Sequence, residues 1–261
     1  MLREYANEVA TMVNGEVKEV EKPNGLILTG VSVDLGTNLR PCIYLDQMYK
    51  DGLTVEEAAD KVREIAQQNA RPALDLGFLA DFEAVKPMLR ARLYNEKTSA
   101  DIKKSAAGYG FPDLVIIPYI DGVIENGSVK VTFGMLDRWN VSAAEVIDIA
   151  EANSRNEATM RSMVEVLQGL GYPIPDLEDQ PEMLVISSVS GSFGAYSIIT
   201  KLDDLKKRYK NGFTVLPSSV HEVIVVEEDA PETFDNMVND VNDSELDYTD
   251  ILSNHAYRIA A

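Results

Sequence analysis

The chain has 261 residues, 45% hydrophobic and 26% charged, which is enough for one large domain or two small ones with a buried core. Its 43 acidic residues against 24 basic ones give a net charge of −19. This charge disfavours direct binding to nucleic-acid phosphates or anionic membranes, and it favours solubility and basic partners. A single cysteine excludes an internal disulfide and a cysteine-based zinc site. Without an apolar run of ~18 residues or a signal-peptide apolar segment, we expect a cytoplasmic protein with no membrane contact.

Helical and strand patterns alternate along the first two thirds of the chain. Apolar residues at helical spacing mark the helices, and β-branched, aromatic runs behind turn residues mark the strands. Helices are predicted at 2–13, 53–68, 81–95, 141–152 and 159–171, and strands at 24–35, 40–49, 113–120 and 127–135, the last two as a hairpin.

Two of these helices have a marked start. Thr54 stands three residues before Glu57, and Ser142 stands three residues before Glu145. That spacing is typical of a capping box, in which an N-cap hydroxyl and an N3 carboxylate satisfy free backbone N–H groups. The strand-to-helix joints before the two caps also correspond loosely, which leaves open two related α+β lobes.

The stretch "YPIPDLEDQPE" (172–182) opposes both helix and strand, because it contains three prolines and four acidic residues. We therefore predict a connector at 172–182 between an N-terminal α+β region (1–171) and a C-terminal region (183–261). In the latter the elements follow the order β-β-α-β-β-α-β, with 195–200 as the second strand and short links that favour antiparallel pairing. The fold class is α+β, with mixed, mainly antiparallel sheets packed with amphipathic helices.

The familiar motifs of cofactor and metal chemistry are missing. No phosphate-binding loop of the form G-x-x-x-x-G-K-[ST] occurs, and Gly191 and Gly194 of "GSFG" are interpreted as turn residues. The acidic run at 243–254 resembles a calcium loop, but it has Tyr248 in place of the glycine and Asn254 in place of the closing glutamate. We predict no cofactor and no catalytic residue, and a weak calcium or magnesium site stays open.

The chain has two histidines, His221 in "LPSSVHEVIVVEED" and His255 in "LSNHAYRI". The run "VIVV" is apolar on both faces, which predicts a central buried strand with His221 at its entry. The favoured interpretation is that both rings are structural, and the alternative is that they belong to a site. The candidate binding residues are Ser218, Ser219, His221, Asn254 and His255.

The segment from Asn211 to Tyr257 has eleven acidic residues and no lysine or arginine. Such an asymmetry of charge can mark an interaction surface.

Five stretches carry a resemblance to a known family. In chain order they are "NGLILTGVSV", "NLRPCIYLDQMYKDG", "VTFGMLDRWNVSAAEV", "LPSSVHEVIVV" and "LSNHAYRI". Together they resemble a bacterial domain-of-unknown-function family, the one numbered five-six-eight-eight, and two of them are distantly similar to the YtpQ-like proteins. The resemblance implies an α+β protein over most of the chain and adds no catalytic residue. It directs attention to His221 and His255, which lie within matching stretches.

Three functions follow from these observations. The first is an intracellular binding or interaction module without catalytic activity; its protein partner is unknown, and the acidic charge leaves a basic partner open. The second is a small hydrolase or transferase that uses Ser219, His221 and His255. On a strand, however, Ser219 and His221 would lie ~6.5–7 Å apart along the chain, too far for a direct hydrogen bond. The third is an acidic mimic of nucleic acid, which rests on the net charge alone.

Overall fold

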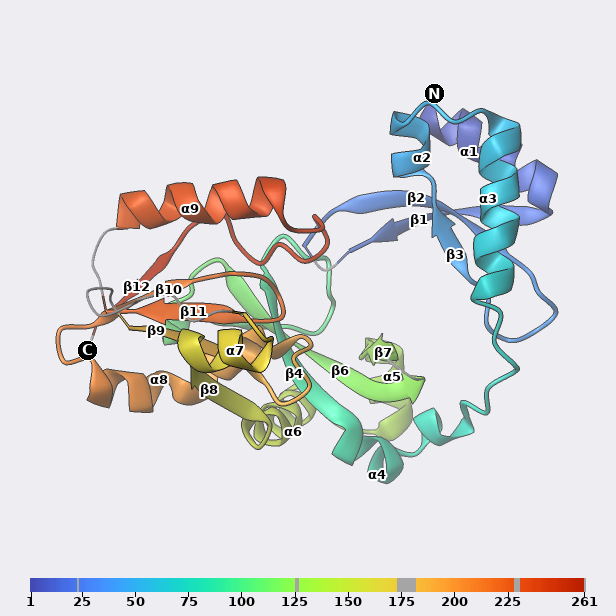
Figure 1. Cartoon of the computed structure of the whole chain (residues 1–261). Helices are drawn as coiled ribbons and strands as arrows, with labels where there is room; N and C mark the ends of the chain where they lie inside the picture. The colour runs from blue at the N-terminus through green and yellow to red at the C-terminus, as the bar shows by residue number, and fades with distance from the viewer. Residues whose placement is uncertain (23, 125–126, 173–181, 228–230, 261) are drawn as a thin grey trace. The chain divides into compact units, whose positions relative to one another are not determined.

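The computed structural model describes residues 1–22, 24–124, 127–172, 182–227 and 231–260. The fold contains two units, Met1–Gly77 and Phe78–Ala261. Within the described residues, the strands form three antiparallel sheets, which confirms the predicted α+β class (Figure 1). In the same residues, no helix has both the length and the apolar character needed to cross a bilayer.

The first unit packs two helices on one face of a three-stranded sheet. The sheet order is β1-β2-β3, and a core of small and branched side chains lies between sheet and helices, including Ala6, Val9, Val31, Ala59 and Val62. The elements are α1 (Leu2–Val13), β1 (Gly15–Glu21), β2 (Ile27–Val33), β3 (Cys42–Tyr44), α2 (Asp46–Lys50) and α3 (Val55–Gln68).

The predicted capping box at the start of α3 is confirmed. The Thr54 hydroxyl accepts the N–H of Glu57 at 3.2 Å, and the Glu57 carboxylate accepts the N–H of Thr54 at 2.9 Å. The predicted strand at 40–49 is only partly right, because it ends at Tyr44 and α2 begins at Asp46. The Asp46 carboxylate accepts the N–H of Thr29 at 2.9 Å, which fixes the turn into α2 against β2.

The second unit contains a four-stranded and a five-stranded sheet. The first has the order β4-β6-β5, with β7 also paired to β6, and the second has the order β12-β10-β11-β9-β8. The 3-10 turn η1 (Gly77–Ala80) lies at the boundary with the first unit. The other elements are α4 (Phe82–Val85), η2 (Lys86–Met88), β4 (Leu89–Asn95), β5 (Lys104–Ser105), η3 (Ala107–Tyr109), β6 (Leu114–Ile124), β7 (Gly127–Lys130), α5 (Phe133–Trp139), α6 (Ala143–Arg155), β8 (Ala158–Ser162), α7 (Met163–Gly169), β9 (Met183–Ser188), η4 (Gly194–Tyr196), α8 (Ser197–Arg208), β10 (Phe213–Leu216), β11 (Val223–Val226), α9 (Pro231–Ser244) and β12 (Tyr257–Ile259).

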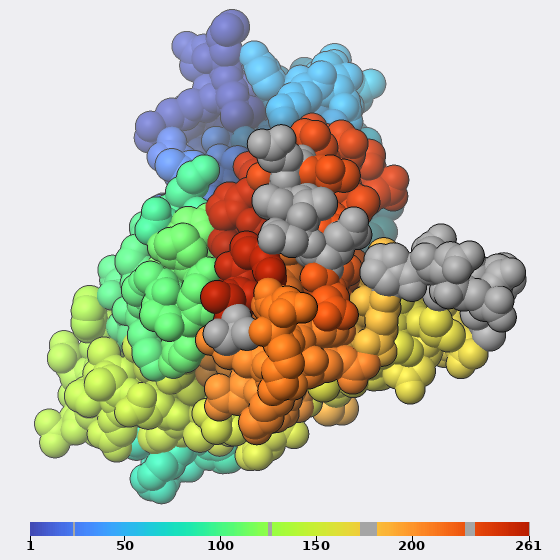
Figure 2. Space-filling view, turned by 90° about the vertical axis from the view of Figure 1, so that its left-hand side faces the viewer, coloured from blue at the N-terminus to red at the C-terminus, as the bar shows by residue number. Residues whose placement is uncertain are grey.

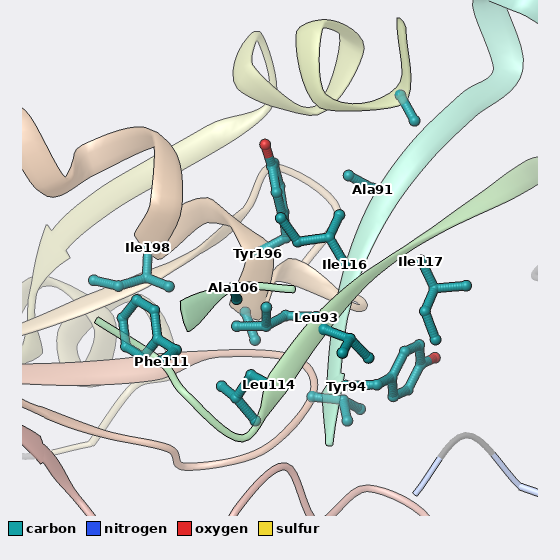
Figure 3. Close-up of a cluster of buried hydrophobic side chains, with 14 of the residues drawn as sticks. Ala91, Leu93, Tyr94, Ala106, Phe111, Leu114, Ile116, Ile117, Tyr196 and Ile198 are labelled. Atoms are coloured by element: carbon teal, nitrogen blue, oxygen red, sulfur yellow. The ribbon is translucent and has the colours of Figure 1, made fainter. Parts of the chain in front are cut away.

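The main core of this unit joins β4, β6 and the start of α8, whose buried side chains meet in one cluster (Figure 3). β11 lies between β10 and β9, as "VIVV" predicts. Val223 and Val225 belong to the main core, whereas Val226 belongs to a smaller cluster with Phe234 and Val238 of α9. α9 therefore covers one face of the five-stranded sheet and α8 covers the other (Figure 1).

Several predicted elements of the second unit are wrong in type. The predicted helix at 81–95 is helical only to Met88, and β4 follows, because Pro87 has no N–H to continue a helix and β4 pairs along its whole length with β6. The predicted helix at 159–171 is the strand β8 followed by α7, and the predicted strand at 195–200 is η4 and the first turn of α8. The hairpin of β6 and β7 is confirmed, but residues after Thr132 form α5.

The predicted connector at 172–182 falls mostly outside the described residues, which do not include 173–181. The strands on either side of it, β8 and β9, pair with each other from Ala158↔Ser188 to Ser162↔Leu184. Division of the chain at this connector stays a prediction.

Candidate functional site

His221 lies in the loop between β10 and β11, where it holds residues 188–194, here called the serine–glycine loop. Its ring Nδ1 accepts the backbone N–H of Phe193 at 3.0 Å, and its carbonyl accepts the N–H of Gly194, also at 3.0 Å. The same carbonyl accepts the hydroxyl of Ser187 at 2.8 Å. A side chain and a carbonyl of one residue thus fix the loop that joins β9 to α8.

The backbone at Phe193 explains why this loop needs support. Phe193 has φ 51° and ψ 30°, in the left-handed region that is unfavourable for a bulky residue. Its ring lies 5.0 Å from the His221 ring, between centroids. Since Nδ1 of His221 is an acceptor, the proton of the neutral ring lies on Nε2, which faces Asp250 Oδ2 at 3.6 Å.

His255 ties the C-terminal segment to the start of β6. Its Nδ1 lies 3.1 Å from the carbonyl of Ala256, and its Nε2 lies 3.2 Å from Asp113 Oδ2. The hydroxyl of Tyr257 donates to the other oxygen of Asp113 at 2.9 Å. Figure 2 shows the red C-terminal segment lying against the green segment that leads into β6.

The other predicted binding residues have separate surroundings. Ser219 is 6% exposed, and its hydroxyl accepts the backbone N–H of His221 at 3.0 Å. Ser218 lines an apolar pocket, and the Asn254 side chain accepts an N–H of Asn242 at 3.0 Å. Within the described part of the chain, no hydrogen bond joins either imidazole to a serine hydroxyl. Each histidine faces a carboxylate but no hydroxyl that it could activate, so the described contacts give no support to nucleophilic catalysis.

A second arrangement has the features of a binding surface. α9, β10 and β11 enclose a pocket of ≈ 60 Å³, and its walls are almost wholly apolar. Met237 and Val241 lie one helical turn apart and are 48% and 36% exposed, although they adjoin the buried stripe of α9. We call this the acidic–apolar surface, and its pocket is lined by Leu216, Pro217, Ser218, Ile224, Met237, Val238 and Val241.

Carboxylates flank the exposed pair. Asp240 follows Met237 by three residues on α9, so it lies beside that stripe, and the exposed Glu245 follows directly after the end of α9 at Ser244. Asp240 is exposed, and so is Asp243. Since Asn211 to Tyr257 contains no lysine or arginine, no basic residue of that segment neutralises these charges.

The exposed apolar pair was not predicted, although the sequence carries a signal for it. Phe234, Met237, Val238 and Val241 follow the i, i+3, i+4, i+7 pattern of one helix face. Sequence alone predicts a buried stripe there. The structure buries Phe234 and Val238, while Met237 and Val241 stay at the surface.

Comparison with known proteins assigns the chain to a family. The model of a family of unknown function, DUF5688, matches residues 1–259. The chain belongs to this family. That result confirms the resemblance carried by the five sequence stretches, and the more distant similarity to the YtpQ-like proteins stays a prediction. No match was found among curated proteins or among solved structures. In this DUF5688 chain, the described residues contain no group of three or more His, Cys, Asp or Glu placed to hold a metal ion.

Proposed function

We propose that the chain is a binding module whose acidic–apolar surface receives a basic, amphipathic segment of a partner protein. The observation that carries the proposal is the pair Met237 and Val241, which is exposed beside an apolar pocket. The exposed charged residues of the same helix, Asp240 and Asp243, are acidic. Helical segments that bind in grooves place apolar side chains in the groove and polar side chains at its rim.

The two parts of the surface contribute differently. Apolar burial supplies affinity, because full burial of a Met or Val side chain is worth ~1.5–3 kcal/mol. Met237 is already about half buried, so its further burial contributes ~1 kcal/mol. The carboxylates mainly set the choice of partner and the rate of association, and their contribution falls as salt rises.

The net charge of −19 poses a specific difficulty for any test, because a cationic peptide can bind such a protein without a defined site. Three labelled peptides of the length of α9, 14 residues, separate the effects. One is an amphipathic Lys/Leu helix, one replaces Leu by Ser, and one replaces Lys by Glu. Fluorescence anisotropy should give tight, salt-sensitive binding for Lys/Leu, weak binding for Lys/Ser and none for Glu/Leu.

The site is then tested by variants. Met237→Ser should weaken Lys/Leu binding about fivefold, the equivalent of ~1 kcal/mol, and leave Lys/Ser binding unchanged. Leu170→Ser is a matched control, since Leu170 is 68% exposed and lies outside this surface, at the end of α7. Equal affinity for Lys/Leu and Lys/Ser, or equal effects of the two substitutions, would contradict the proposal.

A further inference from the structure

A buried arginine lies in the second unit at some distance along the chain from the acidic–apolar surface. Arg92 belongs to β4 and is 5% exposed. Its guanidinium carbon lies 3.6 Å from the ring centre of Phe193 and 4.3 Å from that of Tyr119. The two aromatic rings lie over the guanidinium and attract its positive charge through cation–π interactions.

The neighbouring Arg90 shows what a completed arginine site looks like. Both residues project from the same face of β4, because they are two positions apart. Arg90 donates from Nε and Nη2 to the two carboxylate oxygens of Glu157, at 2.9 and 2.7 Å. This is the two-bond geometry that guanidinium groups form with carboxylates and phosphates.

In Arg92, only one of the two corresponding donors, Nη2, has an acceptor. Its Nη2 donates to Asp121 Oδ1 at 2.6 Å, but its Nε has no hydrogen-bond partner among the described residues and is shielded from solvent. A buried donor without an acceptor is unfavourable, and such groups in native proteins usually have a partner that completes them.

Arg92 lines a pocket of ≈ 30 Å³ between β4 and the serine–glycine loop, and the Arg90–Glu157 pair lines it too. One water-sized group needs ~10–15 Å³ by this measure, so the pocket has room for two or three such groups before any side chain moves. Ser188 and Ser190 also line it, with their hydroxyls 3.0 Å apart, and Ser190 and Ser192 are exposed at the surface. The side with Ser190 and Ser192 gives the head group of a larger molecule a route into the pocket.

We propose that this pocket binds the oxyanion head group of a small ligand, a carboxylate or a phosphate, held side-on by Nε and Nη2 of Arg92. The oxyanion takes the place of Asp121, whose side chain is 41% exposed and can turn into solvent. His221 and Gly194 serve the same site as positioning residues, because they fix Phe193 over the guanidinium. The proposal is independent of the acidic–apolar surface.

The test titrates the full chain with inorganic phosphate and, separately, with sodium acetate, using sodium chloride as the control for ionic strength. Backbone amide signals of residues 188–194 in NMR spectra give the dissociation constant. The chemical shift of the Arg92 Nε–H reports whether the bound anion accepts a hydrogen bond from this group. We expect saturable shifts of both with one of the two oxyanions and none with chloride, and the stronger anion identifies the head group.

Three variants make the result specific. Arg92→Lys keeps the charge but loses the paired donors, and it should weaken binding at least tenfold. Arg161→Lys is the matched control, because Arg161 is exposed on β8 and does not line the pocket, and binding should change less than about twofold. Asp121→Asn removes the competing charge and should strengthen binding.

If Arg92→Lys does not fold, Asp121→Asn still tests whether the oxyanion binds Arg92 in place of Asp121. The proposal is overturned if neither oxyanion shifts the Arg92 signal. It is also overturned if Asp121→Asn leaves the affinity unchanged, or if Arg161→Lys weakens the affinity as much as Arg92→Lys does.

Discussion

Replacement of His221 by alanine tests whether this histidine is structural. The variant removes the Nδ1 acceptor of the Phe193 N–H and the ring that packs on Phe193. A partly buried donor left without an acceptor costs ~1–3 kcal/mol, and the ring contact is worth ~0.5–1 kcal/mol. The Asp250 contact adds little, because it is 3.6 Å long and both side chains are about one third exposed. We expect His221→Ala to lower the free energy of unfolding by ~2 kcal/mol.

The measurement is urea denaturation followed by fluorescence of Trp139, the only tryptophan. Trp139 is 8% exposed and its indole N–H donates to the carbonyl of Leu79, so it reports on the unit that contains His221. His221→Asn should recover part of the loss, since an amide oxygen can accept the Phe193 N–H. His255→Ala is the comparison, and it should cost less because that ring is 44% exposed. An effect of His221→Ala below ~0.5 kcal/mol, or no larger than that of His255→Ala, would refute this reasoning.

Three further predictions concern other parts of the chain. Thr54→Ala should destabilise the first unit by ~1 kcal/mol through loss of the capping box. Hydrogen exchange of the α3 amides should then become faster, and unchanged protection of these amides would mean that the cap contributes nothing. Burial raises the pKa of Tyr119, Tyr196 and Tyr257 above the usual value, so stability should fall as pH rises above ~10, where the unfolded tyrosines ionise first. Absorbance titration that shows all tyrosines ionising together near pH ~10 before unfolding would contradict this. Burial also raises the pKa of the Cys42 thiol, so a thiol reagent should modify it more slowly than free cysteine at neutral pH, and an equal rate would be the opposing result.

Local chemistry in the sequence was sufficient to predict some elements. Thr54 and Ser142 start their helices as their spacing to Glu57 and Glu145 indicates, because N-cap bonds form within one turn. The strand at 223–226 was predictable because a run that is apolar on both faces can only be buried between two layers.

Other elements depend on neighbours distant in the sequence. The stretch "LRARLYN" of β4 is rich in good helix formers, yet its alternating pattern fits a strand, and pairing with β6 decides the outcome. "AYSIIT" favours a strand by composition, but its buried Ile198 faces the main core from the first turn of α8. Intrinsic preference is weaker than burial in both stretches.

The two candidate sites differ in how far the sequence reveals them. The acidic character of the segment from Asn211 to Tyr257 is plain from its residues, and the structure adds the exposed Met237 and Val241. The Arg92 pocket has no sequence signature, because Arg92 and Phe193 lie about a hundred residues apart and meet only through the packing of β4 against the loop after β9. Contacts of that kind depend on the whole fold.

The central claim is that a basic amphipathic segment binds at α9. Its most direct test is an NMR titration of the methyl-labelled chain with the Lys/Leu peptide. The account predicts that the methyl signals of Met237, Val241 and Ile224 shift to saturation, while that of the exposed Val189 stays in place. Saturable binding that leaves Met237 and Val241 unshifted, or shifts distributed evenly over the surface methyls, would contradict the claim.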